Sequence, residues 1–136
     1  MVNQEVGGMN EQISTVTIKY VVEKHCICMA WNHQVTPRDV EAAFAKITDI
    51  LEQSAEPLCV VVDLRDNPNF PLGATLHGAL FGPYRNPKLK EWLIISSNSA
   101  AKMIERVLSS TTGRHNVRWF EQEEAVYAYL EEMTIT

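Results

Sequence analysis

Four side chains in the first third of the chain are of types that ligate metal ions: His25, Cys26, Cys28 and His33. Thiolates and imidazoles hold zinc in structural sites, where the paired cysteines lie on a turn. Cys26 and Cys28 fall instead on a predicted strand, and alternate side chains of a strand cannot fold back around one ion. The pattern favours small strand residues beside exposed histidines, so we expect no metal and no cofactor.

The apolar run 58–64 carries Asp63 near its end, and a polar loop with Arg65 and Asp66 follows it. Ligand and partner sites of open α/β sheets tend to lie at the carboxyl ends of strands. An aspartate at a strand end often accepts hydrogen bonds from loop N–H groups, which is the role we expect for Asp63. The three residues are therefore candidates for a strand-end part of a binding site.

Two catalytic arrangements can be drawn from this region. Cys59 with His77 would make a nucleophile and its base, and Asp63, His77 and Tyr84 could converge. General acid–base catalysis needs a second positioned group and a perturbed pKa, and no motif supplies them. Cys59 also lies early in a buried strand, away from the carboxyl edge. We expect no catalytic residues and a protein that is not an enzyme.

The segment 67–84 contains no Asp, Glu, Lys or Arg and is the sharpest functional candidate. Its part from Leu72 to about Phe81 is predicted to be a short helix that Gly82 and Pro83 end. Two apolar stripes lie about a hundred degrees apart on that helix. They consist of Leu72, Leu76 and Leu80, and of Ala74, His77, Phe81 and Tyr84. The candidate partner- or ligand-binding residues are Phe70, Leu72, Thr75, Leu76, His77, Leu80, Phe81 and Tyr84.

Three explanations account for a helix that is apolar on two faces. The helix is core covered by its neighbours, or half of a symmetric dimer contact, since exposed apolar patches mark partner surfaces. Alternatively, it lines a pocket for an apolar ligand, with His77 and Tyr84 as polar handles. Gly73, Gly78 and Gly82 each weaken a helix by about 1 kcal/mol relative to alanine, which favours a mobile segment.

The periodicity of apolar residues predicts the elements that must position these side chains. Thr36, Pro37 and Asp39 form a helix start with a capping box, and Gly113 follows the end of another helix. The predicted strands are 15–22, 26–31, 58–64, 92–96 and 117–120. The predicted helices begin at 36–37, 72, 98–99 and 121.

This order, β-β-α-β-α-β-α-β-α, predicts an α/β fold with a mixed, mainly parallel five-stranded sheet. The short connection between the first two strands makes them an antiparallel hairpin. Right-handed crossovers along a sequential sheet place the helices mainly on one face. Residues 1–12 are predicted to be a flexible tail, and residues 13–136 a single domain.

Composition excludes several classes of protein. The net charge of −5 argues against nucleic-acid binding, which needs a clustered basic surface. No apolar run reaches membrane-spanning length, and the N-terminus lacks the pattern of a signal peptide. Three cysteines, an odd number with two of them poorly spaced for a disulfide, predict reduced thiols and a cytoplasmic location.

The chain resembles the STAS fold over about residues 15–133, and within it the SpoIIAA-like branch of anti-sigma-factor antagonists. The branch is related by its superhelix to Sec14-type lipid carriers. Besides the element order, the resemblance rests on Trp31 closing the second strand, on the helix start at Thr36, and on Trp92 opening the fourth strand. It also rests on Val61-Val62-Asp63-Leu64 and on the terminal pattern Glu123-Glu124-Ala125-Val126 with Tyr129 and Leu130.

The resemblance implies a bacterial regulatory module of signal transduction rather than an enzyme. Phosphoswitch members carry Asp-Ser-Ser-Gly after the third strand, whereas this chain has Phe70-Pro71-Leu72-Gly73-Ala74-Thr75. Thr75, near a helix N-terminus, is therefore the candidate phosphosite. We expect a module that binds a partner or itself through the 70–84 helix. The alternative is a carrier or sensor of a small, lipid-like ligand beneath that helix.

Overall fold

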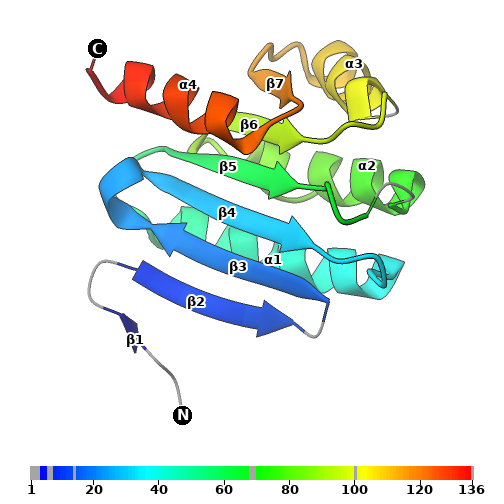
Figure 1. Cartoon of the computed structure of the whole chain (residues 1–136), viewed down its shortest axis with the longest axis horizontal. Coiled ribbons are helices and arrows are strands. Elements are labelled where there is room, and N and C mark those ends of the chain that lie inside the picture. Colours follow the sequence, from blue (N-terminus) through cyan, green and yellow to red (C-terminus); the bar gives the residue numbers. More distant parts are fainter. Residues whose placement is uncertain (1–3, 6–7, 14, 68–69, 100, 136) are drawn as a thin grey trace.

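A seven-stranded sheet forms the centre of the molecule in the computed structural model, which describes residues 4–5, 8–13, 15–67, 70–99 and 101–135 (Figure 1). The strands lie side by side in chain order. They are β1 (Gln4–Glu5), β2 (Gly8–Ile13), β3 (Val16–Val21), β4 (Cys26–Trp31), β5 (Leu58–Asp63), β6 (Leu89–Ile95) and β7 (Val117–Phe120). The helices are α1 (Pro37–Gln53), α2 (Leu72–Leu80), α3 (Ala101–Thr112) and α4 (Glu123–Ile135), with 3-10 turns η1 (Val22–Lys24) and η2 (Pro83–Arg85).

The strand directions follow from the connections. Neighbours from β1 to β4 pair antiparallel, with only a few residues between consecutive strands. Neighbours from β4 to β7 pair parallel because a helix lies in each connection. From β3 onward the order is the predicted β-β-α-β-α-β-α-β-α. The α/β class and the mixed, mainly parallel pairing of these five strands are therefore confirmed.

The predicted number of strands was wrong. Residues 4–5 and 8–12, expected to lie in a flexible tail, form β1 and, together with Ile13, β2 at the antiparallel side of the sheet. The register pairs Met9 with Tyr20 and Glu11 with Ile18. Backbone hydrogen bonds to neighbouring strands hold such strands in place, so they need no continuous apolar pattern that a sequence would show. The start of β6 also differs, because it begins at Leu89 rather than at Trp92.

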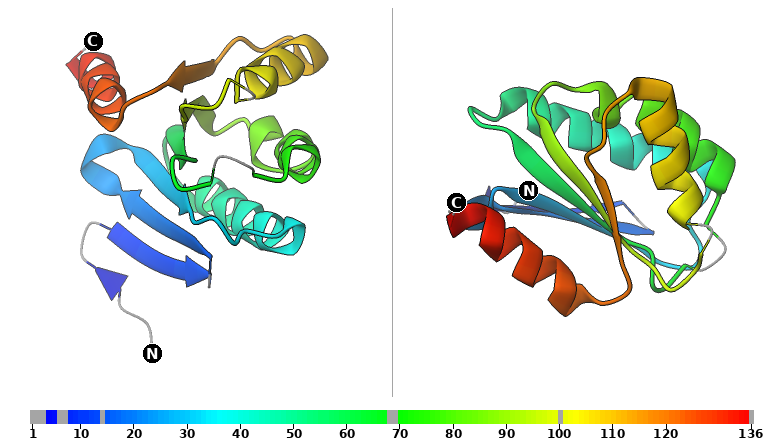
Figure 2. Two further views of the ribbon diagram at one scale, coloured as in Figure 1. Left: turned by 45° about the vertical axis from the view of Figure 1, so that its right-hand side comes forward. Right: turned by 90° about the horizontal axis from the view of Figure 1, so that it is seen from above.

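Helices α1, α2 and α3 cover one face of the sheet and α4 lies on the other (Figure 2). The prediction of helices mainly on one face is confirmed. Because strand side chains alternate, β5 sends Val60 and Val62 into the main core under α1 to α3. It sends Cys59 and Val61 into a smaller core under α4. This two-sided burial explains why the strand is apolar throughout.

No helix among the described residues is both long and apolar enough to cross a membrane.

Candidate functional site

A capping box anchors α1 beside the sheet, as predicted. The Thr36 hydroxyl accepts a hydrogen bond from the Asp39 amide at 3.2 Å, and an Asp39 carboxylate oxygen accepts one from the Thr36 amide at 3.1 Å. The same oxygen accepts a bond of 2.7 Å from the Thr15 hydroxyl. This bond is the main reason that the pKa of Asp39 lies below its ordinary value. Asp39 thus fixes the start of α1 against the residue that precedes β3.

Helix α2 approaches α1 so closely that only glycine fits at the crossing. A Cβ atom on Gly78 would lie 2.7 Å from Cδ2 of Phe44. The Phe44 ring is 3% exposed and packs against Trp31 and Trp92, with ring centroids 6.1 and 5.6 Å away. A Cβ atom on Gly82 would lie 2.6 Å from the Gly78 carbonyl oxygen. The glycines that the sequence suggested as a source of mobility therefore permit close packing at these positions.

A groove of about 560 Å³ lies along the outer side of this crossing, and we call it the α1–α2 groove. Its edge carries Phe81, which is 69% exposed, and the His77 ring, whose centroid is 4.8 Å from that of Phe81. The Arg85 guanidinium lies over the Phe81 ring, 5.7 Å from its centroid. The lining residues are Pro37, Glu41, Phe44, Ala45, Thr48, Asp49, Ala74, His77, Gly78, Phe81 and Gly82.

The structure divides the predicted 70–84 residues between core and surface. Thr75 and Ala79 form the buried line of α2, and Phe70 is buried beside them. Leu72, Leu76 and Leu80 are half-buried against the main core. Of the predicted binding residues, His77 and Phe81 line the α1–α2 groove.

Tyr84 is fully buried, so it cannot serve as the polar handle of a surface site. It lies in η2, where its ring packs edge-on to Trp92 with centroids 6.4 Å apart. Its hydroxyl donates a bond of 2.6 Å to Oδ1 of Asn116, and burial raises its pKa. The turn at Gly82 and Pro83 redirects the chain here, which helical periodicity could not foresee.

Thr75 is 2% exposed, and its hydroxyl donates to the Pro71 carbonyl oxygen at 2.8 Å. A kinase could reach this hydroxyl only if α2 opened. The geometry gives no support to Thr75 as a phosphosite in the folded chain.

The strand-end loop is shaped by Arg65. Its Nε and Nη2 donate to the two carboxylate oxygens of Asp63 at 2.9 and 2.7 Å, and its amide donates to Oδ1 at 3.1 Å. Partial burial alone would raise the pKa of Asp63, but the hydrogen bonds and charge of Arg65 outweigh it and lower the pKa. Arg65 also lies 3.6 Å from Glu123 in the first turn of α4, while Asp66 is exposed.

The residues of the conceivable catalytic sets have separate partners. Asp63 binds Arg65, Tyr84 binds Asn116, and the His77 ring packs on Phe81. Cys59 lies in the small core on the α4 face, whereas His77 lines the α1–α2 groove on the other face. Within the described ranges, no three His, Cys, Asp or Glu side chains are placed to hold a metal ion together.

All three cysteines are free thiols. The sulfur atoms of Cys26 and Cys28 lie 3.8 Å apart on the α4 face. That hydrogen bond is the main cause that lowers the pKa of Cys28, and the charges of Lys19 and Lys24 act in the same direction. Burial raises the pKa of Cys59 to about 11, which makes it a poor nucleophile.

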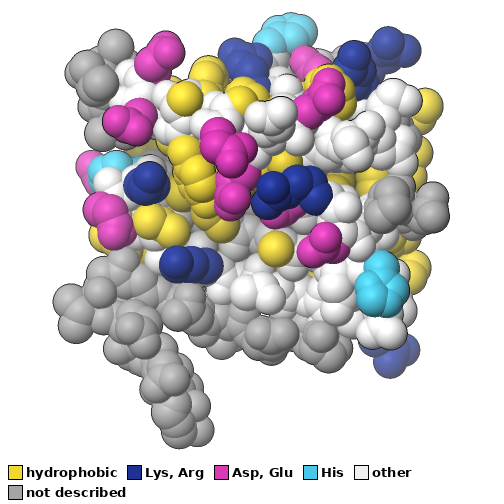
Figure 3. Space-filling model, in the orientation of Figure 1, with side chains coloured by type: hydrophobic (Ala, Val, Ile, Leu, Met, Phe, Trp, Pro, Cys, Tyr) yellow, Lys and Arg dark blue, Asp and Glu magenta, His cyan; other side chains and the backbone are white. Residues whose placement is uncertain are grey.

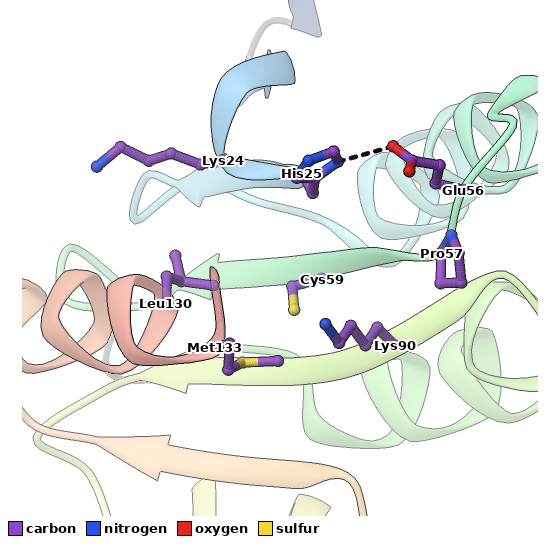
Figure 4. A pocket seen from close by; sticks show the side chains of 8 residues that line it. All are labelled: Lys24, His25, Glu56, Pro57, Cys59, Lys90, Leu130 and Met133. Atoms are coloured by element: carbon purple, nitrogen blue, oxygen red, sulfur yellow. Dashed lines mark ion pairs between the residues drawn. The ribbon is translucent and has the colours of Figure 1, made fainter. Parts of the chain in front are cut away.

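A second hollow, which the sequence did not indicate, lies on the α4 side where β4, β5 and β6 begin (Figure 4). We call it the amino-edge pocket; its volume is about 350 Å³. Its lining residues are Lys24, His25, Glu56, Pro57, Cys59, Lys90, Leu130 and Met133. Nδ1 of His25 lies 3.2 Å from the Glu56 carboxylate. The only signal in the sequence is that charged residues precede or open three successive parallel strands, whose amino ends must share one edge.

Comparison with known proteins finds no matching family model, no matching curated protein and no matching solved structure.

Proposed function

We propose that this chain is a non-catalytic regulatory module that binds a protein partner through the α1–α2 groove. The observation that carries the proposal is Phe81, a large aromatic side chain that is 69% exposed at the edge of an open groove. Aromatic side chains beside a pocket are typical of residues that dominate the binding energy of protein interfaces.

Exposure alone does not single out Phe81, because Val22 and Met103 are also large and exposed at 40% and 48%. Neither of these two lines the α1–α2 groove. Phe81 is the most exposed of the three, and a partner that covered it would also cover the neighbouring face of His77. Burial of this connected apolar area would stabilise a complex at about 25 cal/mol per Å² before the costs of association.

The charges around the groove favour one kind of partner. Among the described residues, Glu41 and Asp49 line it from α1 and no Lys or Arg does so, while the Arg85 guanidinium lies over Phe81 at its edge. An apolar segment flanked by basic residues would complement this lining. A second copy of the chain would bring the same two acids, and the chain carries a net charge of −5. The charge pattern thus favours a different protein over self-association.

The STAS-like, SpoIIAA-like assignment supports the same class of function. The order from β3 to α4 is the order on which the resemblance rests. The usual phosphoserine segment is absent, and the nearby hydroxyl of Thr75 is buried. We therefore propose a module regulated by other means than phosphorylation of α2. The three free thiols fit a reducing, cytoplasmic setting.

The alternative, a small lipid-like ligand beneath α2, has less support. The side of α2 that faces the core is filled by Thr75, Ala79 and the half-buried leucines. The groove runs along the surface between α1 and α2, which suits a polypeptide segment better than an enclosed lipid.

Replacement of Phe81 by Asp tests the proposal, since this exposed side chain can be changed without a loss of core packing. A matched control is Met103→Asp, which places the same charge at an exposed apolar position of α3. The tagged full-length chain is expected to retain a bound protein in the wild-type and Met103→Asp forms. Phe81→Asp should weaken that binding about tenfold or more.

Native mass spectrometry of the gently purified chain separates the remaining outcomes. If the chain is a dimer that Phe81→Asp converts to a monomer, the partner is a second copy of the chain rather than a different protein. A mass of a few hundred extra daltons that is lost on activation would establish the ligand alternative. Equal binding by Phe81→Asp and the wild type in every assay would refute the proposal.

A further inference from the structure

We propose that the amino-edge pocket binds a small amphipathic monocarboxylate, whose carboxylate meets Lys90 and whose apolar tail lies on Cys59, Leu130 and Met133. The pocket lies on the α4 side of the sheet, whereas the α1–α2 groove lies on the other face. The inference is therefore independent of the function proposed above.

The charge around the pocket has the opposite sign to that of the whole chain. Lys24 and Lys90 contribute two positive charges to the lining and Glu56 one negative charge. The Lys24 ammonium points away and Glu56 lies beside His25, so Lys90 is the charge that faces the hollow. The chain as a whole carries −5. Figure 3 shows the α4 face, on which basic and acidic side chains surround a strip of apolar side chains beside α4. A local positive charge in an acidic protein selects for an anionic ligand.

Lys90 is the cation that is available to a ligand. Glu56 is engaged by His25 at 3.2 Å, and the Lys24 ammonium lies over the Tyr127 ring at 4.9 Å from its centroid. Figure 4 shows Lys90 extending from β6 toward Cys59, while Lys24 points away from the pocket. Among the described residues, no carboxylate lies within ion-pair distance of the Lys90 ammonium.

The floor of the pocket is apolar. Leu130 and Met133 reach in from α4, and Cys59 lies on β5 between them and Lys90 (Figure 4). Because the pKa of the Cys59 thiol is raised to about 11 by burial, the thiol stays neutral and adds no charge at pH 7. A ligand that fits must carry its charge at one end and an apolar surface at the other.

Size and electrostatics limit the ligand to a small monoanion. The volume of about 350 Å³ lies near the lower end of the roughly 300–1,000 Å³ of ligand sites. Leu130 and Met133 belong to the last two turns of α4, and the C-terminal end of a helix carries a partial negative charge. A multiply charged phosphate would be repelled there, and none of the described residues that line the pocket is an arginine that could hold its oxygens in a bidentate way. A single carboxylate beside one ammonium is the better match.

Calorimetric titration of the full-length chain with sodium octanoate tests the inference, with acetate and octan-1-ol as probes that lack the tail or the charge. Octanoate should bind more tightly than both. Lys90→Met should weaken octanoate binding about three- to fivefold, the size of one half-exposed ion pair, and Lys90→Glu by about tenfold. Neither variant should change the affinity for octan-1-ol by a comparable factor.

Two control variants locate the site. Lys102→Met removes an exposed ammonium from α3, and Phe81→Asp alters the α1–α2 groove; both should bind octanoate like the wild type. The inference is overturned if octan-1-ol or acetate binds as tightly as octanoate, or if Lys90→Met has no effect. It is also overturned if Phe81→Asp abolishes binding, since octanoate would then occupy the groove.

Discussion

At the scale of one residue, Arg65 holds the strand-end loop in place. The sequence predicted this loop as part of a binding site. Arg65 makes a two-pronged contact with Asp63 at the end of β5 and lies 3.6 Å from Glu123 at the start of α4. A strand end, a loop and a helix of the opposite layer are thus joined by one guanidinium. The loop that contains Asp63, Arg65 and Asp66 is better explained as a structural junction than as a binding surface.

The pH dependence of stability tests this role of Arg65. The pKa of Asp63 in the folded chain lies below its ordinary value of 3.8, so the contact stabilises the fold above that pH and is lost as pH falls. Arg65→Gln should therefore lower the free energy of unfolding at pH 7. The difference from the wild type should shrink as the pH falls below about 4, the region in which an unperturbed aspartate is protonated.

Urea unfolding at pH 7, 5 and 3.5 would measure that difference. Arg65→Lys is the matched control, because it keeps the charge but loses the two parallel hydrogen bonds, and it should fall between the other two forms. A difference between Arg65→Gln and the wild type that stays constant across these pH values would contradict the assigned role of Asp63.

At the scale of the elements, the packing of α2 on α1 decides both the core and the groove. Gly78 lets α2 lie against Phe44, and Phe44 is itself wedged between Trp31 and Trp92. The close approach turns Thr75 and Ala79 into the core and leaves Phe81 outside. The two-faced apolar character of the helix thus has two explanations at once, core on one side and an exposed groove on the other.

Gly78→Ala should lower the free energy of unfolding by about 1–3 kcal/mol, because the new methyl group would lie 2.7 Å from a ring that cannot move aside. Gly73→Ala is the control on the same helix. Its Cβ atom would have nothing within 4 Å, so this variant should be neutral or more stable by up to about 1 kcal/mol. Thermal and denaturant unfolding measure both; equal stability of the two variants would contradict the close crossing.

At the scale of the whole molecule, the sequence predicts those helices and strands whose apolar residues recur at a regular local spacing. The five strands from β3 to β7 and all four helices follow from apolar repeats, and the capping box follows from the four-residue stretch between Thr36 and Asp39. Tyr84 was misplaced because its burial depends on a turn after the helix. The amino-edge pocket was missed because it joins residues from two connections, two strands and α4, and no local pattern encodes that meeting.

The antiparallel edge was missed for a related reason, since β2 is defined by its pairing with β3 rather than by its composition. Within β3, Val16 and Ile18 are buried in the main core, while Thr17 and Lys19 are exposed on the other face. The backbone of β2 pairs with β3 from Val16 to Val21 and covers the edge that β3 would otherwise expose. This assigns the first residues a protective role against pairing with other chains.

Removal of residues 1–14 tests that role. The shortened chain should still fold, because its core residues from Val16 onward are retained, but its uncovered β3 edge should pair with other copies. Light scattering should then show oligomers that grow with concentration, whereas the full-length chain should not form them through this edge.

Thr17→Lys in the shortened chain should reduce the association, because an edge lysine opposes strand pairing and Thr17 points to solvent. A shortened chain that is as stable as the full-length protein and equally monomeric would show that β2 does not protect the sheet.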